Sequence, residues 1–377
     1  MLKPVTLSVG IQQPEASIAE LQRQLWDVFA IADTRVLQPP DEVVEFRGAL
    51  QQPSDRAYAA IGPRFKAAGY TALLYHDQTQ DVVQALKGVE QGRPGRVWVN
   101  LLLLALTIVT TLMAGALVAG VRVASLEVFA RQPDLLLAGL PFASALLLIL
   151  GVHEMGHYVA GKAHRAVVTL PYFIPLPPFG ALPLGTLGAF IQLRSPIRHR
   201  RALFDIGLAG PAAGLVVAVA VFAVGVALSQ PVLAASGSST LGRSLFTTAV
   251  IGLMHPVAVR PGMALEINPL LLAGWLGLFV TVINLLPIGQ LDGGHILYAA
   301  IGRNARLIGL GTIGVLLTVG YLTVSPTWIL WGLLGLFFGV RHAPTLDDIT
   351  PLDPARRLLA VATLIVFALI FVPVPFR

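Results

Sequence analysis

Two histidines and a glutamate inside a long apolar stretch have the clearest chemical meaning in this sequence. His153, Glu154 and His157 stand in the order His-Glu-x-x-His. On a helix, histidines four residues apart lie on one face, so both imidazoles can bind one Zn²⁺ while the glutamate deprotonates the water on that ion. Because the chain has only 8 histidines in 377 residues, chance is a poor explanation of this spacing. The pattern predicts a single catalytic zinc ion with Glu154 as the general base.

A purely structural interpretation of the same residues is also open. His153 and His157 would then be core histidines bonded to neighbouring carbonyls, and Glu154 would lie at the membrane interface. That interpretation leaves the spacing unexplained. Ionisable groups inside membrane helices are costly and usually functional, so the location also favours the metal site.

A catalytic zinc site needs a third protein ligand, and cysteine cannot supply it because the chain has none. The carboxylates expected near the same membrane side are Asp205, Asp292, Asp347 and Asp348. Asp292 is favoured, because Pro287 and the glycines around it interrupt an apolar helix and would bring its carboxylate to the level of the histidines. Its alternative role is a helix N-cap before His295. Asp205 is expected to cap a helix or to pair with the arginines at 200 and 201.

The composition places most of the chain in a membrane. Hydrophobic residues make up 55% and charged residues 12%, and the mean hydropathy is +0.75, whereas about a quarter of the residues of a soluble protein are charged. A secreted disulfide scaffold, a soluble nucleic-acid binder and a disordered protein are thereby excluded. The formal charge of +6 indicates loops that face anionic lipid rather than a nucleic-acid partner.

The chain divides into two predicted domains. Residues 1–96 resemble a soluble α+β domain on the N-terminal side, with a helix from Ser17 that carries Leu21, Leu25, Val28 and Phe29 on one face, a second helix at 54–68, and strands at 43–48 and 70–75. Residues 97–377 form the predicted multi-span membrane domain, whose catalytic core covers about 136–302.

About seven stretches are apolar over roughly the 20 residues that a span needs. They are 97–119, 136–160, 203–228, 268–288, 306–324, 326–341 and 356–373. Basic residues near the span ends are far more numerous on the side that holds the N-terminus, which favours a cytoplasmic N-terminus. The predicted fold is therefore an α-helical polytopic membrane protein with about seven transmembrane helices and a small N-terminal α+β soluble domain.

The segment after the second predicted span cannot be another straight helix, because five prolines interrupt it between residues 171 and 183. Its end, Gly185–Leu193, is punctuated by glycine and extended in character. Irregular backbone at membrane depth survives only where protein or a wet cavity covers it. We therefore expect a strand in a re-entrant segment, with an edge that an unwound substrate can pair with; the candidate substrate-binding residues there are Gly185, Gly188 and Phe190.

The motifs together resemble the site-2 protease family of intramembrane zinc metalloproteases. The resemblance lies in the pairing of His153–His157 with Asn284–Gly293 on successive membrane helices, and 209–214 is similar to the small-residue stretch of the family's middle core helix. Gly185–Leu193 is similar to its membrane-dipping strand. No PDZ-like segment is evident, and the N-terminal region with 342–348 most resembles the branch found in cyanobacteria, plastids and some other bacteria.

The resemblance implies a set of roles for residues of this chain. His153, His157 and Asp292 are implied to hold the zinc ion, Glu154 to act as general base, and Asn284 to help hold the substrate or its oxyanion. The implied substrate is a transmembrane-helix protein in the lipid bilayer, cleaved within or near its membrane segment in regulated intramembrane proteolysis. We expect a multi-pass protein of a bacterial inner membrane, with the N-terminus and the active site toward the cytoplasm.

Two other classes of function remain open at this point. A metal-ion transporter would use intramembrane histidines and carboxylates as a transit site, but it needs them spaced along a pathway and this chain concentrates them at one depth. A catalytically inactive member would bind membrane helices without cleaving them, and the intact ligand set argues against it.

Overall fold

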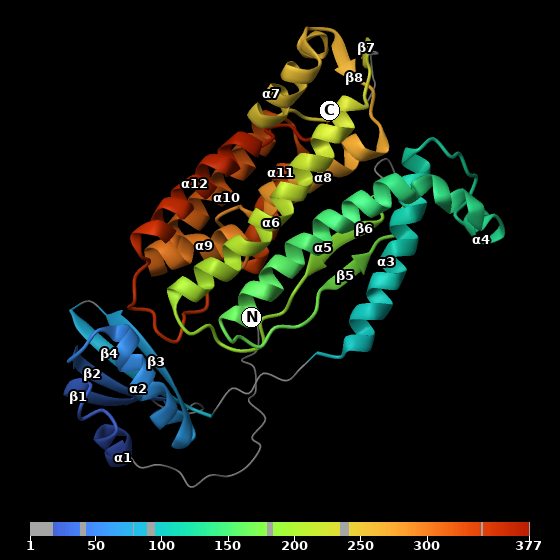
Figure 1. The fold of residues 1–377 in the computed structure, drawn as a ribbon. Coiled ribbons are helices and arrows are strands. Elements are labelled where there is room, and N and C mark those ends of the chain that lie inside the picture. The colour runs from blue at the N-terminus through green and yellow to red at the C-terminus, as the bar shows by residue number, and fades with distance from the viewer. Residues whose placement is uncertain are drawn as a thin grey trace.

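The computed structural model describes residues 18–37, 43–77, 79–88, 95–178, 184–233, 241–340 and 342–376. Two main hydrophobic clusters organise these residues. One lies within the N-terminal sheet and its helices, and the other joins the long apolar helices. Figure 1 shows the N-terminal part at the end of the helical bundle where α6 (Arg200–Ala227) begins.

The N-terminal part is an antiparallel sheet covered by a helix. The strands are β1 (Phe29–Leu37), β2 (Val43–Leu50), β3 (Tyr70–Asp77) and β4 (Gln80–Lys87), in the order β1-β2-β4-β3, and the helices are α1 (Ile18–Arg23) and α2 (Ser54–Ala67). Phe65 of α2 meets Phe46 of β2 edge to face, with ring centroids 6.4 Å apart. The predicted α+β character is confirmed, and β3 lies at one edge of the sheet.

Two predictions for this part need correction. The first helix ends at Arg23, because the chain turns after it and Phe29 already belongs to β1. Val28 and Phe29 are nevertheless buried. Their apolar character therefore indicated correctly that they are buried, but not that they are helical. Ser17 lies outside the described residues. The strands β1 and β4 were not predicted, since their alternation is broken by polar residues.

The membrane part is mostly helical. In chain order its elements are α3 (Val97–Val118), α4 (Glu127–Arg131), η1 (Pro133–Gly139), α5 (Leu140–Ala163), β5 (Tyr172–Pro175), β6 (Thr186–Phe190), α6, β7 (Pro231–Leu233), α7 (Leu245–Met254), η2 (Pro256–Val259), β8 (Met263–Leu265), α8 (Pro269–Asn284), α9 (Asp292–Ile301), η3 (Gly302–Asn304), α10 (Ala305–Leu322), α11 (Pro326–Phe338) and α12 (Pro354–Ile370).

Four helical stretches of the described chain are long and apolar enough to cross a membrane. They are 97–118, 133–163, 200–227 and 292–322. The other three predicted spans are helical but short, since α8 has 16 residues, α11 has 13 and α12 has 17, against about 20 for a perpendicular crossing. The structure thus supports a polytopic membrane protein with four candidate spans.

Close packing of α5, α6 and α8 builds the centre of the helical part, where α5 and α6 lie side by side (Figure 1). Glycines permit this approach: a Cβ at Gly156 would lie 2.5 Å from the Ala209 carbonyl oxygen, and one at Gly274 would lie 2.4 Å from the Phe222 backbone nitrogen. Small residues at helix contacts are the usual means by which membrane helices approach each other.

The predicted extended segment forms a β-hairpin beside these helices. Strand β6 pairs antiparallel with β5, with Phe190 opposite Tyr172 and Gly188 opposite Ile174. The start of β6 is fixed to α3, since the Thr110 hydroxyl donates to the Gly185 carbonyl oxygen at 2.6 Å. Gly185 has φ +77°, and a Cβ there would lie 2.5 Å from the Thr111 Cα, so only glycine fits this turn.

Candidate metal centre

The two histidines of the motif face the aspartate that begins another helix. His153 and His157 lie one turn apart on α5, and their Nε2 atoms are 3.1 Å apart. Asp292 is the first residue of α9, and its Oδ2 lies 3.3 Å from His153 Nε2 and 3.2 Å from His157 Nε2. The side chains are 5%, 7% and 15% exposed, respectively. Three donor atoms therefore converge on one buried point, as the sequence predicted.

The spacing of these donors fits a zinc ion. Zinc binds imidazole nitrogen and carboxylate oxygen at about 2.0–2.2 Å in tetrahedral geometry, so neighbouring ligand atoms should be about 3.3–3.5 Å apart. The three observed distances, 3.1, 3.2 and 3.3 Å, are close to the edges of that tetrahedron. Two histidines and one carboxylate also leave one position open, which is the donor count of catalytic zinc sites.

Glu154 lies beside the donor set without belonging to it. Its Oε1 is 4.0 Å from His153 Nε2, and the side chain is 6% exposed. A backbone hydrogen bond links its carboxylate to Ile191, directly after β6. The carboxylate is therefore held between the metal ligands and the end of the strand segment, where a general base for a reaction at the metal has to be.

Helix α6 orients one histidine of the donor set and approaches both. The Nδ1 of His157 lies 2.7 Å from the Ile206 carbonyl oxygen. A carbonyl can only accept, so Nδ1–H is the donor and Nε2 is left to face the point where the three donor atoms converge. A Cβ at Gly210 would lie 2.1 Å from His157 Nε2, and one at Gly214 would lie 2.9 Å from the His153 Cβ. The small-residue stretch of α6 is thus a contact surface for the ligand histidines.

Asn284 lies in the same site. It is the last residue of α8, and its Nδ2 is 3.2 Å from His153 Nε2. The amide therefore sits at the rim of the donor set, where it is able to reach a group bound at the metal. The structure brings together His153, Glu154, His157, Asn284 and Asp292, all five predicted members of the catalytic group.

A tight turn between α8 and α9 places Asp292. A Cβ at Gly293 would lie 2.1 Å from the Leu285 carbonyl oxygen, and one at Gly294 would lie 2.4 Å from that of Gly289, so the start of α9 folds back onto the turn. The N-cap of α9 is Leu291 and it makes no side-chain cap. Asp292 is therefore not an N-cap, and its carboxylate is available to the histidines.

The expectation for Asp205 is wrong in both parts. The N-cap of α6 is His199, whose ring accepts from the Ala202 backbone N–H at 3.0 Å. Asp205 instead receives two hydrogen bonds from Arg356, at 2.7 and 2.6 Å, and lies 2.9 Å from His164 Nε2. It ties α6 to α12, and the carboxylate is not a metal ligand.

Two contacts of the site were not predicted. The carbonyl of Ile206 is invisible to motif analysis, since any residue offers a carbonyl. His295 Nδ1 lies 2.6 Å from His342 Nε2, although these histidines are 47 residues apart and show no ligand spacing. The sequence did contain one signal for the contact between α6 and the histidines of α5. Gly210 and Gly214 are four residues apart and therefore lie on one face of α6, the face that packs on α5.

The substrate-binding candidates lie on the β6 hairpin. Gly188 has φ +107° with open space around its Cβ position, and Phe190 is 42% exposed. Leu187, between them, is 66% exposed. Gly185 instead packs against α3 and anchors the strand.

Comparison with known proteins identifies the same region. Residues 141–325 match peptidase family M50. The chain is 36% identical over 244 residues to the probable zinc metalloprotease EGY1, chloroplastic, of Arabidopsis thaliana, which is 63% of this chain and 43% of that protein. It is 29% identical over 249 residues to EGY2, chloroplastic, also named a probable zinc metalloprotease, of the same plant, 64% of this chain and 43% of that one.

The chain thus covers less than half the length of these relatives. The solved structures contain no match to it. The matched region includes α5, α6, α8 and α9, and therefore every residue of the metal centre. Residues 141–325 of the chain accordingly form a domain of peptidase family M50, the site-2 protease family.

Proposed function

We propose that this protein is an intramembrane zinc metalloprotease that hydrolyses peptide bonds within or near the transmembrane segments of other membrane proteins. The observation that carries the proposal is the buried donor set of His153, His157 and Asp292 with Glu154 beside it. Its position between apolar helices gives the reason for a membrane substrate, because a soluble protein would have to leave water to reach it.

Peptide hydrolysis at this site would use both a metal ion and residues of the protein. His153, His157 and Asp292 would hold a zinc ion, which would polarise the scissile carbonyl and activate water as a nucleophile near neutral pH. Glu154 takes the proton of the attacking water and returns it to the leaving amine. The Asn284 amide donates a hydrogen bond to the substrate near the reacting carbonyl, and Ile206 keeps His157 in the tautomer that binds metal.

Zinc analysis together with a cleavage assay tests this function. The protein purified in detergent should contain about one zinc ion per chain and cleave a membrane-helix substrate. Removal of the metal with a chelator should abolish cleavage, and added zinc should restore it. Full cleavage by the metal-free protein would contradict the proposal.

We propose that substrate pairs with the open edge of β6. A transmembrane helix hides its carbonyls in internal hydrogen bonds, so the scissile segment must unwind before hydrolysis, and an extended segment gains new backbone bonds from a strand edge. Ile191 follows β6 directly and is bonded to Glu154. A substrate strand beside Gly188 and Phe190 would therefore reach the general base.

Single prolines at positions 187, 189 and 190 test the strand edge, since each removes one backbone donor; Gly188 is left unchanged because proline cannot adopt its φ of +107°. We expect the positions whose N–H points away from β5 to lose most cleavage while the zinc content stays at the wild-type level. Proline at the positions that face β5 serves as the comparison for damage to the hairpin. Unchanged cleavage at all three positions would remove strand pairing from the proposal.

We also propose seven spans, with the N-terminal domain of residues 1–96 and the metal centre toward the cytoplasm of a bacterial inner membrane. Tilting of neighbours and local thinning let short helices such as α8, α11 and α12 cross. Arginines stand before or at the start of α6 (Arg194, Arg198, Arg200 and Arg201) and at the start of α12 (Arg356 and Arg357), and the Arg303 guanidinium lies 4.7 Å from the centre of the Tyr75 ring of the N-terminal domain.

The absence of natural cysteines makes this topology measurable. Single Asp55→Cys and Arg260→Cys variants place one exposed thiol in α2 and one in the loop before β8. We expect a membrane-impermeant thiol reagent to label Arg260→Cys in intact cells and Asp55→Cys only after the membrane is opened. Labelling of both from outside would contradict the orientation.

A further inference from the structure

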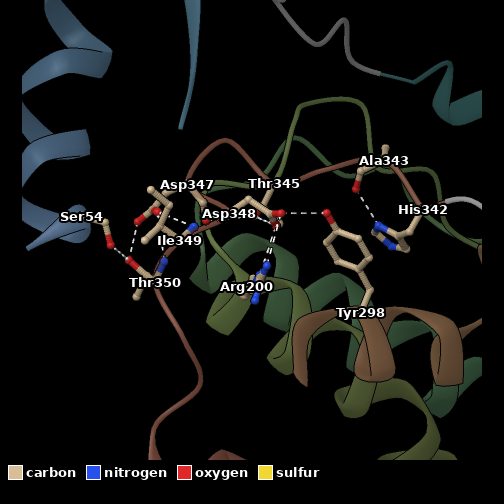
Figure 2. Close-up of polar contacts among 10 residues, drawn as sticks. All are labelled: Ser54, Arg200, Tyr298, His342, Ala343, Thr345, Asp347, Asp348, Ile349 and Thr350. Atoms are coloured by element: carbon tan, nitrogen blue, oxygen red, sulfur yellow. Dashed lines mark hydrogen bonds and ion pairs between the residues drawn. The ribbon is translucent and has the colours of Figure 1, made fainter. Parts of the chain in front are cut away.

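A short segment of the chain lies between the N-terminal domain and the membrane helices. We call residues 345–350 the clasp. Figure 2 shows it reaching Ser54 of α2 on one side and Arg200 of α6 and Tyr298 of α9 on the other. The clasp carries four buried residues with an acidic or hydroxyl group, Thr345, Asp347, Asp348 and Thr350, which the metal centre does not use.

The backbone of the clasp is bonded on both sides. Leu74 of β3 donates to the Leu346 carbonyl oxygen at 2.7 Å, and the Asp348 N–H donates back to the Leu74 carbonyl oxygen at 2.8 Å. On the other side, the Leu346 N–H donates to the Ile197 carbonyl oxygen at 2.9 Å and the Asp347 N–H to that of Arg198 at 2.7 Å. The clasp therefore extends the edge of the N-terminal sheet and joins it to the approach to α6.

Side chains fix the clasp to the N-terminal domain. Leu346 and Ile349 pack against the hydrophobic core of that domain. The Thr350 hydroxyl lies 2.7 Å from that of Ser54. Asp347, 1% exposed, accepts from the Ile349 and Thr350 backbone N–H groups at 3.1 and 3.2 Å, which holds the segment in its turn. Contacts with the N-terminal domain thus hold the clasp in place.

Asp348 fixes the other side to two membrane helices. The carboxylate is 4% exposed. It accepts from Arg200 Nε at 3.1 Å and Nη2 at 3.3 Å, from the Tyr298 hydroxyl at 2.9 Å and from the Thr345 hydroxyl at 3.1 Å. A cation at a helix N-terminus is unfavourable on its own, and a buried carboxylate needs its partners. Asp348 and Arg200 therefore hold each other in place.

Both helices that Asp348 joins position the metal centre. Tyr298 belongs to α9, which begins with the metal ligand Asp292, and Arg200 begins α6, whose Ile206 carbonyl orients His157. The N-terminal domain has a second contact with the same region, where the Arg303 guanidinium lies 4.7 Å from the centre of the Tyr75 ring. A displacement of the clasp would reach Asp292 and His157 through two rigid helices.

We infer that the N-terminal domain acts on the metal centre through the clasp, and that Asp348 is the positioning residue which holds α9 against α6 so that Asp292 meets the two histidines. The inference rests on the proposed zinc site and is independent of proteolysis. Its consequence is that zinc affinity depends on an acidic residue that contacts no metal ligand in the described structure.

Zinc affinity of three variants tests the inference, measured by competition with a chelating dye on folded, monodisperse protein. We expect Asp348→Asn to weaken zinc binding by up to about tenfold, because Asp348 acts through two helices, whereas loss of a group that bonds a metal ligand directly costs about 10–100-fold. Tyr298→Phe removes only the hydroxyl donor and keeps the ring stacked on His342, so it should fold and weaken binding several-fold. Asp353→Asn is the matched control, an acid-to-amide change in the N-cap of α12, and should bind as the wild type does.

Wild-type affinity in both Asp348→Asn and Tyr298→Phe would overturn the inference, and a melting temperature lowered without any loss of zinc affinity would do the same. A wild-type protein that binds no zinc would instead overturn the proposed metal site. The two failures are therefore distinguishable.

A disulfide tests the part played by the domain. Ser54→Cys with Thr350→Cys introduces the only thiols of the chain, at positions whose hydroxyl oxygens are 2.7 Å apart. We expect mild oxidation to close this pair, and in the Asp348→Asn background the oxidised protein should bind zinc more tightly than the same protein after reduction. Failure of the disulfide to form, or equal affinity in the two states, would overturn the coupling of the domain to the metal.

Discussion

The Glu154→Gln protein is expected to keep about one zinc ion per chain and to lose cleavage by a factor of about 10² to 10⁴. Glu154 lies 4.0 Å from the nearest ligand nitrogen and outside the donor set, so an amide of the same shape leaves the metal site intact. The amide cannot take the proton of the attacking water. The loss corresponds to about 3–5 kcal/mol of transition-state stabilisation.

The matched comparison is His157→Ala, which removes a metal ligand. This variant should lose zinc and cleavage together, because only two of the three donors remain. Zinc by elemental analysis and initial cleavage rates on the same samples separate the two classes of variant. A fully active Glu154→Gln protein would overturn the proposed role of this carboxylate.

The second large effect is expected at a glycine, which has no side chain. Gly210→Ala should prevent stoichiometric zinc binding and abolish cleavage, because the new Cβ would lie 2.1 Å from His157 Nε2 and 2.5 Å from its Cε1. The ring is also held by a hydrogen bond, since its Nδ1 lies 2.7 Å from the Ile206 carbonyl oxygen. Either the ligand or α6 must shift, and overpacking of this kind costs about 1–3 kcal/mol.

The control for this prediction is the same substitution where it meets nothing. A Cβ at Gly311 of α10 has open space around it, so Gly311→Ala should keep zinc and activity and should not lower the melting temperature, because alanine favours helix over glycine by about 1 kcal/mol. Gly214→Ala lies between the two, at 2.9 Å from the His153 Cβ. Full zinc content in Gly210→Ala would show that α6 is less closely packed than the structure indicates.

The histidine half of the metal centre was predictable because its geometry is local. Residues four apart on a helix share a face whatever the rest of the chain does, so His153 and His157 had to point the same way once α5 formed. The role of Asp292 does not follow from local geometry alone. A carboxylate at the start of a helix has the same local pattern whether it caps the helix or binds a metal, and only the turn onto Leu285 decides between them.

Other predictions failed where the partner lies far along the chain. Asp205 has arginines nearby in sequence, yet its carboxylate pairs with Arg356, 151 residues away. The predicted helix from Ser17 was too long because buried residues in a turn and a strand continued its apolar pattern. The spans at 268–288, 326–341 and 356–373 gave shorter helices, since hydropathy reports apolar composition and not where helical hydrogen bonding ends.

The sequence by itself predicted the lipid surroundings of most of the chain, the metal chemistry and the residues expected to carry it, because composition and the spacing of groups on one helix do not depend on distant contacts. Only the tertiary structure decided that three donor atoms lie 3.1–3.3 Å apart, that Gly210 touches a ligand ring, and that Asp348 joins α6 to α9. Those facts depend on which helices pack together, and packing is set by close contacts between segments that the chain order does not place side by side.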